Sequence, residues 1–365
     1  MNYNDLVRPQ VAALKPYSAG TTVSQARAAY ATERFVKVSQ NENPLGTSPK
    51  AQAALAGLGE LQIYVDDDHT ELRRRLAEPY GLRVEHVLVG HGSNDVVRTL
   101  FTAFLAPGDE VVLAAPTFQL FPKDAALFDA RPVGVPLREG VHDLDAMLAA
   151  ITPRTKMVVV CDPNNPTSTR VEPAACDRVA RALPGRVILI VDQAYREYMP
   201  PGSLEAVDYV ARRPATIVLR THSKIYGLAA LRFGYALGDP TLLGYAQRIR
   251  LPFNVSLPAA VAALAALDDV AFVRRSQEMN VAGKAYYEEQ LARLGLPVYP
   301  TAANFVAVGV PGSANEAYQA LLRQGIVTRS GDALGMPGRL RITIATPEQN
   351  ALVVAALATL VATPA

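Results

Sequence analysis

Lys224 is the residue of this chain whose surroundings most directly suggest covalent chemistry. It comes shortly after an apolar run, Ile217–Leu219, with Ser223 before it and Arg232 further along. A lysine beside a buried strand can lose solvent, which lowers the pKa of its amine, and the neutral amine is the form that attacks a carbonyl carbon. Ser223 and Arg232 add a hydroxyl and a permanent cation, which suit a phosphate group. Because a single lysine in a loop is more often solvated, Lys224 alone does not define a site.

A second candidate is the turn Gly90–Asp95, which precedes a predicted helix. A glycine turn at a helix N-terminus offers free backbone N–H groups at the positive end of the helix dipole, where phosphate groups bind. Ser93 and Asn94 would supply these N–H groups. In the alternative interpretation, Ser93 or Asn94 simply caps the helix. Asp95 occupies the last glycine position of the dinucleotide-binding pattern, which argues against a nicotinamide enzyme.

A third group of polar residues follows two further apolar runs. Asp192 comes directly after Val187–Val191, and Tyr195 follows it. An aspartate at the end of a buried strand is unfavourable unless it meets a cation or hydrogen-bond donors, although a helix N-cap is equally compatible with the sequence. After Met157–Cys161, residues 162–167 place two asparagines between two prolines, which predicts a rigid turn.

All of these residues follow short apolar runs that predict buried β-strands. The runs do not alternate with polar residues, which is typical of strands covered on both faces. They are Val87–Val89, Val111–Leu113, Met157–Cys161, Val187–Val191, Ile217–Leu219 and Phe233–Leu237. Helical patterns lie between them, at Asp95–Leu105, Asp143–Ala150 and Pro173–Leu183. The alternation predicts an α/β fold with a largely parallel sheet, in which ligands bind at the carboxyl ends of the strands.

The length of 365 residues suggests two domains, or a large domain with a smaller one attached. Further helical and strand-like patterns occur late in the chain, at Ala259–Leu267, Ala271–Leu294, Ala303–Val308 and Gly338–Ile344. We therefore expect a large domain over residues 36–250 and a smaller α+β domain over residues 251–365. Residues 1–35 have weak periodicity and are expected to form an arm and a segment that packs on the smaller domain.

The composition argues against several classes of function. The 36 basic and 34 acidic residues give a net charge of +2, so no general affinity for nucleic acid or an anionic membrane is expected. Cys161 and Cys176 form no CxxC pair and the five histidines form no HExxH motif, so neither a disulfide scaffold nor a metal site is expected. No apolar stretch reaches the roughly 18 residues of a membrane helix, and a signal-peptide layout is not evident, so a cytoplasmic location is expected.

The order of these motifs resembles that of the fold-type-I aminotransferases, which use pyridoxal phosphate (PLP). The similarity is greatest to the histidinol-phosphate aminotransferase branch and covers essentially the whole chain. It is carried by Asn41–Gly46, Gly92–Ser93, Asn164–Thr167, Ser223–Lys224, Leu231–Tyr235, Ala303–Phe305 and Leu340–Thr343. The resemblance implies a large PLP-binding domain, with a mostly parallel seven-stranded sheet flanked by helices, and a smaller α+β domain.

The resemblance assigns roles around the cofactor ring. Lys224 matches the lysine that binds PLP covalently and later moves a proton between the substrate Cα and the cofactor. Asp192 matches the residue that keeps the pyridine nitrogen protonated, and a charge pair about 4 Å apart is worth roughly 4 kcal/mol at an effective dielectric near 20. Tyr195 and Asn165 would hydrogen-bond the ring oxygen O3′, and Phe118 would stack on the ring. Lys224, Asp192 and Tyr195 are thus the predicted catalytic residues.

The resemblance also implies a phosphate site and a homodimer. The cofactor phosphate would bind the N–H groups of Ser93 and Asn94, the Ser223 hydroxyl and Arg232. Tyr64 matches a tyrosine that reaches the phosphate of the partner subunit's cofactor, so the active site would be shared between two subunits. The alternative is that Tyr64 is a surface or interface aromatic residue without that contact.

For the substrate, the resemblance points to two arginines and a tyrosine. Strand alternation places Arg339 and Arg341 on one face, and the resemblance selects Arg341 as the anion-binding residue, with Arg339 solvated. Arg329 matches the second arginine, and Tyr17 matches an N-terminal tyrosine that lines the substrate pocket. These residues would suit a dianionic phosphate, but they would also bind an α-carboxylate.

The chain departs from the family pattern at several positions. Ser168-Thr169 stands where a glycine is common after the asparagine turn, Gln193 replaces a glutamate, His222 replaces a phenylalanine, and Asn94-Asp95 stands for Asp-Glu. The Ser-Thr variant also resembles aromatic amino acid aminotransferases of the phenylalanine type, as do Leu251–Phe253 and Ala345–Asn350. These departures remove no essential group, but they leave the substrate open.

The leading prediction is a PLP-dependent aminotransferase that exchanges the amine of histidinol phosphate with 2-oxoglutarate in a ping-pong cycle. The main alternative is the same chemistry on phenylalanine, tyrosine or histidine. Less favoured are a decarboxylase of the threonine-phosphate type, a binding or regulatory protein on this fold, and a hydrolase centred on Ser223 and Lys224. The predicted partners are a small amino donor, a 2-oxo acid and a second copy of the chain.

Overall fold

The central sheet has seven strands, and all but one of them run in the same direction. In the computed structural model, which describes residues 6–16, 20–30 and 35–362, the strand order is β2-β8-β7-β6-β5-β3-β4. The strands are β2 (Val87–His91), β3 (Glu110–Ala115), β4 (Arg131–Pro136), β5 (Thr155–Cys161), β6 (Ile188–Asp192), β7 (Thr216–Thr221) and β8 (Phe233–Gly238). Only β8 is antiparallel to its neighbours. The predicted α/β class with a mostly parallel sheet is confirmed.

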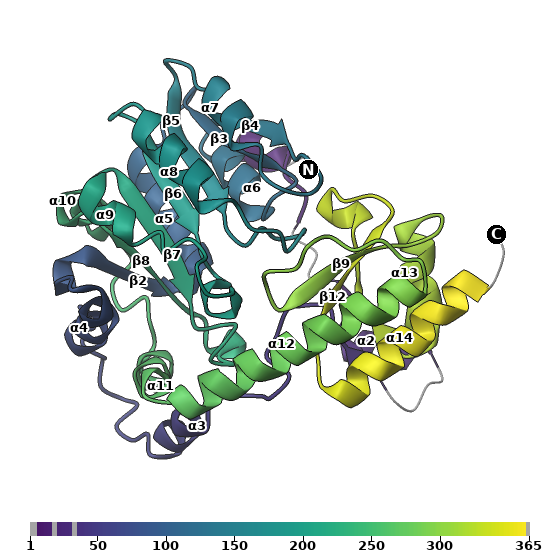
Figure 1. Cartoon of the computed structure of the whole chain (residues 1–365). Helices are drawn as coiled ribbons and strands as arrows, with labels where there is room; N and C mark the ends of the chain where they lie inside the picture. Colours follow the sequence, from purple (N-terminus) through teal and green to yellow (C-terminus); the bar gives the residue numbers. More distant parts are fainter. Residues whose placement is uncertain (1–5, 17–19, 31–34, 363–365) are drawn as a thin grey trace.

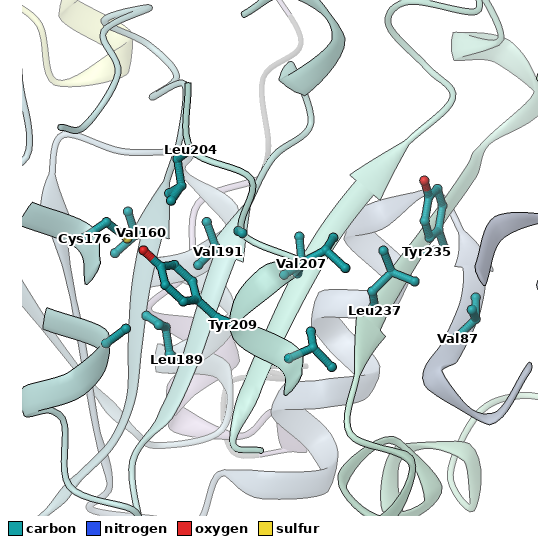
Figure 2. Close-up of a cluster of buried hydrophobic side chains, with 14 of the residues drawn as sticks. Val87, Val160, Cys176, Leu189, Val191, Leu204, Val207, Tyr209, Tyr235 and Leu237 are labelled. Carbon is teal, nitrogen blue, oxygen red and sulfur yellow. The ribbon is translucent and has the colours of Figure 1, made fainter. Parts of the chain in front are cut away.

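Helices cover both faces of this sheet, as strands without a polar face require. Successive strand residues point to opposite sides, so Val159 of β5 packs in one core and Val160 in the other. The Val159 core is covered by α5 (Ser93–Phe104), α6 (Leu120–Leu127) and α10 (Pro240–Gln247). The Val160 core is covered by α4 (Thr70–Ala77), α7 (Leu144–Ala149), α8 (Pro173–Ala182), α9 (Asp208–Arg212) and α11 (Leu257–Leu267). Figure 2 shows part of the Val160 core, with Leu189 and Val191 of the adjacent strand β6.

Segments from both ends of the chain build the second part of the molecule (Figure 1). Its strands are β1 (Val36–Lys37), which pairs with β10 (Ile326–Val327), and the antiparallel set β11 (Arg329–Ser330), β12 (Arg339–Thr343) and β9 (Phe305–Gly309). The helices around them are α2 (Val23–Ala29), α12 (Val270–Arg293), α13 (Ala314–Arg323) and α14 (Pro347–Ala362), while α1 (Pro9–Ala12) contacts α6 and α3 (Pro49–Ala56) packs on α11. No helix in residues 6–16, 20–30 or 35–362 is long and apolar enough to cross a membrane.

The large sheet contains one strand that the sequence pattern does not indicate. Pro132, Gly134 and Pro136 interrupt β4, and prolines argue against a central strand. β4 is an edge strand that pairs with β3, and an edge tolerates the missing proline N–H.

The domain boundary near residue 250 stays a prediction. The helix α11 packs Ala259 and Ala263 into the core of the large sheet, and α12 continues from there to the second part (Figure 1).

Candidate active site

A cavity of about 560 Å³ opens where the carboxyl ends of the large sheet meet the second part. Of the residues predicted from the sequence, those that line it are Ser93, Asn94, Phe118, Asn165, Asp192, Tyr195, Ser223, Lys224, Arg232, Arg329 and Arg341. Tyr64 is not among the lining residues, and Tyr17 lies outside the described residues. The lining also includes residues without a predicted role, mainly Gln40, Asn41, Glu42, Thr117, Gln119, Cys161 and Leu334.

Lys224 lies in the turn that follows β7. Its Nζ donates to the carbonyl of Gln40 at 3.3 Å and lies 5.6 Å from the centre of the Tyr195 ring. Burial and, secondly, the Arg341 guanidinium lower the pKa of the Lys224 amine to about 8. The turn packs closely on the segment before α3, because a β-carbon at Gly227, whose φ is +66°, would overlap the Gly46 carbonyl oxygen. Because the pKa of Lys224 is about 8, a substantial fraction of its amine is neutral near pH 8, as attack on a carbonyl requires.

Asp192 is the last residue of β6 and lies opposite Cys161 of β5. Its Oδ1 accepts from the Ala194 N–H at 3.0 Å, and the Cys161 Sγ lies 3.9 Å from its Oδ2. Burial raises the pKa of Asp192 to about 6, although the hydrogen bond from the Ala194 N–H acts in the opposite direction. The carboxylate is thus mainly ionised at neutral pH and can pair with a cationic ring nitrogen. The alternative helix-cap role does not apply, since α-helical residues do not follow it directly.

The turn between β2 and α5 has the features of an anion site. Gly92 precedes α5, and no side chain caps this helix in the part of the chain that the structure describes, so neither Ser93 nor Asn94 acts as the cap. Arg232 reaches the turn from the other side: a β-carbon at Gly92 would lie 2.5 Å from its Nη2. The Arg232 Nη1 also lies 3.4 Å from the Ser223 Oγ. Two backbone N–H groups, a hydroxyl and a guanidinium therefore converge, which is the donor set of a phosphate dianion.

Tyr195 and Asn165 have partners that bear on their predicted contact with the ring oxygen. Asn41 Nδ2 donates to the Tyr195 hydroxyl at 2.9 Å, which leaves the phenolic proton available for another acceptor. Burial raises the pKa of Tyr195, so it stays a neutral phenol. The Asn165 Oδ1 accepts from Arg341 Nη1 at 2.7 Å, which leaves its amide N–H groups as donors.

The two arginines at the other end of the cavity are cross-strand neighbours. Arg329 of β11 lies directly opposite Arg341 of β12 in the antiparallel register. The Arg341 guanidinium also donates to the Ser39 carbonyl at 2.6 Å. Gly20 packs against the Arg329 guanidinium so closely that a β-carbon there would overlap it. Arg339 does not line the cavity and lies 3.7 Å from the centre of the Tyr299 ring instead.

The departures at Gln193, His222 and Ser168-Thr169 lie behind the lining, whereas Asn94 lines the cavity itself. Gln193 is buried and donates to the Leu204 carbonyl at 2.9 Å, so it shapes the chain after β6. His222 is buried and stacks on Tyr226 at a ring separation of 4.3 Å. Ser168 and Thr169 are also buried and are not among the residues that line the cavity.

Tyr64 lies on the surface, with 80% of its area exposed. It stacks on Phe253 at a ring separation of 4.5 Å and an interplanar angle of 24°. The stack is held by Asp67, which accepts from Arg250 at 2.8 Å and from the Phe253 N–H. Leu61, Ile63 and Leu251 are further exposed apolar residues of the same two segments.

Comparisons with known proteins agree in one family. Residues 33–357 match the family model for aminotransferases of class I and II. The chain is 41% identical to histidinol-phosphate aminotransferase of Moorella thermoacetica, over 96% of this chain and 92% of that protein. It is 41% identical to histidinol-phosphate aminotransferase 2 of Pseudomonas aeruginosa, over 94% and 95%. The structure of histidinol-phosphate aminotransferase from Sinorhizobium meliloti, in complex with pyridoxal-5'-phosphate, matches with a TM-score of 0.88 and 26% identity, over 98% of this chain and 97% of that one.

Proposed function

The chain belongs to the aminotransferases of class I and II, and from this premise we propose that it transfers the amino group of histidinol phosphate to 2-oxoglutarate. The products would be imidazole acetol phosphate and glutamate. Aminotransferases of this family depend on PLP, so PLP is the cofactor of this enzyme.

The observation that carries the proposal is the convergence on one cavity of a buried amine, a buried carboxylate and an anion site. Asp192 ends β6, and Lys224 and Arg232 lie near opposite ends of the connection between β7 and β8, yet all three line the same cavity. This set fits PLP, whose aldehyde, ring nitrogen and phosphate need those three kinds of partner. A hydrolase centred on Ser223 and Lys224 would need no buried aspartate and no anion site.

Bound PLP supplies a carbonyl that accepts an amino group and a ring that stabilises negative charge at the substrate Cα. The residues of the chain would do the rest. Lys224 would take the proton from the substrate Cα and pass it to the cofactor, because its lowered pKa lets the amine exchange protons near neutral pH. Asp192 holds a proton on the ring nitrogen, and Tyr195 with Asn165 orients the ring oxygen. Ser93, Asn94, Ser223 and Arg232 are proposed to hold the cofactor phosphate, and Phe118 to stack on the ring.

Arg329 and Arg341 are proposed to bind the anionic group of each substrate in turn. Guanidinium groups bind phosphate and carboxylate through paired hydrogen bonds, so one site can serve both substrates of a ping-pong cycle. The name of the relatives that are 41% identical over nearly the whole chain supports histidinol phosphate as the donor. Ser168 and Thr169, the departure that resembles aromatic aminotransferases, do not line the cavity, so they give no direct support to an aromatic donor.

We also propose that the enzyme is a homodimer in which Tyr64 reaches the partner subunit's cofactor phosphate. The exposed stack of Tyr64 and Phe253, with Leu61, Ile63 and Leu251 nearby in sequence, supplies an apolar surface of the kind that protein interfaces bury. Sedimentation of the wild type should give twice the mass of the chain, and Tyr64→Phe should weaken PLP binding without dissociating the dimer. A monomeric wild type would contradict this proposal and leave the rest of the site in place.

The substrate is tested by mixing the PLP-loaded enzyme with histidinol phosphate or phenylalanine, one at a time, without an oxo acid. The readout is the change in cofactor absorbance during a single turnover. We expect rapid conversion by histidinol phosphate and slow conversion by phenylalanine. The reverse order would make the enzyme an aromatic aminotransferase, and no conversion by either would overturn the proposed donor class.

A further inference from the structure

Ser168 adopts a backbone conformation that a residue with a side chain rarely adopts. Its φ is +66°, in the left-handed region that glycine enters without steric cost. It is completely buried, and its N–H donates to the Asn164 carbonyl at 2.7 Å, which closes the turn that carries Asn165. A residue held in such a conformation suggests that its side chain supplies something that glycine could not.

The Ser168 side chain joins this turn to a distant part of the chain. Its Oγ accepts from the Ala303 N–H at 3.1 Å, and its carbonyl accepts from the Ala302 N–H at 2.7 Å. Ala302 and Ala303 lead directly into β9, which begins at Phe305. The turn after β5 is therefore fixed to the start of β9 by two hydrogen bonds, and only one of them requires a side chain.

This connection bears on Arg341, because β9 is the strand that pairs with β12. Ala307 of β9 lies opposite Arg341 in the register. The tip of Arg341 is held at the same turn, since its Nη1 donates to the Asn165 Oδ1 at 2.7 Å. Arg341 is thus attached to one turn at two points: directly through its guanidinium, and through β9 and Ser168 at its backbone.

We propose that Ser168 is a positioning residue that fixes Arg341 in the substrate anion site. The inference rests on the proposed function, in which Arg341 binds the anionic group of the donor. Without the Ser168 hydroxyl, β9 and β12 are held less firmly relative to the turn, and the guanidinium meets the substrate anion in a poorer geometry. Such a change weakens binding of the substrate in the ground state and in the transition state equally, which raises KM and leaves kcat almost unchanged.

The test compares Ser168→Gly and Ser168→Ala in the PLP-loaded enzyme with histidinol phosphate as donor. Both variants lose the hydroxyl, so both should raise KM by roughly two- to tenfold, the effect of one hydrogen bond, with kcat within about twofold of wild type. Their melting temperatures should differ, because glycine relieves the strain at φ +66° and alanine does not. If both variants have the same raised KM but only Ser168→Gly gains stability, the loss of the hydroxyl explains KM and the backbone strain explains stability. That result would separate a positioning role from a purely structural one.

A readout that needs neither cofactor nor substrate is amide hydrogen exchange. In the PLP-free protein, the Ala303 N–H should exchange faster in both variants than in wild type, because its side-chain acceptor is gone. Asp239→Ala is the matched control for the loss of a side-chain acceptor. It removes the acceptor of the Thr241 N–H at the start of α10, outside the cavity lining, so it should lower stability without changing KM.

Arg341→Ala, measured alongside, distinguishes the two proposals. If Arg341→Ala leaves KM unchanged, the proposed anion site is wrong. If Arg341→Ala raises KM but both Ser168 variants keep the wild-type KM, the anion site stands and the positioning role of Ser168 is overturned.

Discussion

The two ends of the cavity are built in different ways. At the cofactor end, most of the groups lie at or shortly after the carboxyl ends of the parallel strands of one sheet, and backbone N–H groups at the start of α5 are part of the proposed phosphate site. At the substrate end, Arg329 and Arg341 belong to short strands of the second part, and their partners Gly20 and Ser39 lie near the N-terminus. The groups of the first end are brought together mainly by the order of the strands, whereas those of the second depend on contacts between distant segments.

The largest effect should follow from removing the amine at the cofactor end. Lys224→Ala should reduce turnover by at least about 1000-fold, because no other amine lines the cavity among the residues that the structure describes. The fold should remain intact, as judged by circular dichroism. Lys284→Ala is the control, since Lys284 donates to the Thr301 carbonyl away from the cavity. Retention of a tenth of the wild-type rate would refute the role of Lys224.

The next largest effect should come from the substrate end. Arg341→Ala should raise KM for both anionic substrates by roughly 30- to 100-fold, the effect of one charge-assisted hydrogen-bond pair, and leave PLP affinity near the wild-type value. Steady-state kinetics and a PLP titration measure the two quantities. If PLP affinity falls as far as KM rises, the two ends of the cavity are not separate in the way proposed.

A substitution at Gly92 should weaken PLP binding and leave KM nearly unchanged, the opposite of Arg341→Ala. Gly92→Ala would place a β-carbon 2.5 Å from the Arg232 Nη2, so Arg232 must move and PLP should bind roughly tenfold more weakly, with little change in KM. Gly108→Ala is the matched control, because Gly108 also has a positive φ but has no atom near the new β-carbon. Equal PLP affinities of the two variants would show that strain, and not the contact with Arg232, governs the result.

A final effect concerns stability and not catalysis or binding, and it depends on pH. Lys224 has a pKa of about 8 in the folded PLP-free protein and an ordinary value of 10.5 when unfolded. Between these values the unfolded chain binds more protons, so stability should rise as pH increases from 8 to 10.5. Lys224→Met should therefore stabilise the PLP-free protein by about 3 kcal/mol at about pH 7, and most of the difference should disappear near about pH 10.5. Urea unfolding at both pH values measures this, and a difference that does not depend on pH would be inconsistent with a buried amine.

The contrast between the two ends also explains what the sequence could reveal. Lys224, Asp192 and the Gly90–Asp95 turn follow apolar runs, and parallel strands bring their carboxyl ends to one edge, so the proximity of these groups follows from the sequence alone. The phosphate and helix-cap interpretations of Ser93 could not be separated, because a cap is decided by side-chain geometry that the sequence does not contain.

Residues at the substrate end carry no such local signal. Arg341 and Arg329 are identified through family resemblance, and their opposite positions in one register follow from a pairing between strands of two to five residues. Cys161 lines the cavity, but in the sequence it is simply the last apolar residue of a predicted strand. The hydrogen bonds of Ser168 to residues more than 130 positions away likewise depend on how the two parts pack.

The helix α12 runs from one of these parts to the other, so a tilt at one of its ends displaces the other end. Its 24 residues span about 36 Å at 1.5 Å per residue, from the Asp269 cap, which is anchored by the Ser48 hydroxyl, to the core around Tyr287 and Leu291. A rotation of about 5° at the Asp269 end would displace the far end by about 3 Å, which follows from that length. If the loss of the Ser48 hydroxyl let α12 tilt by that angle, the far end of the helix would move by about the length of a hydrogen bond.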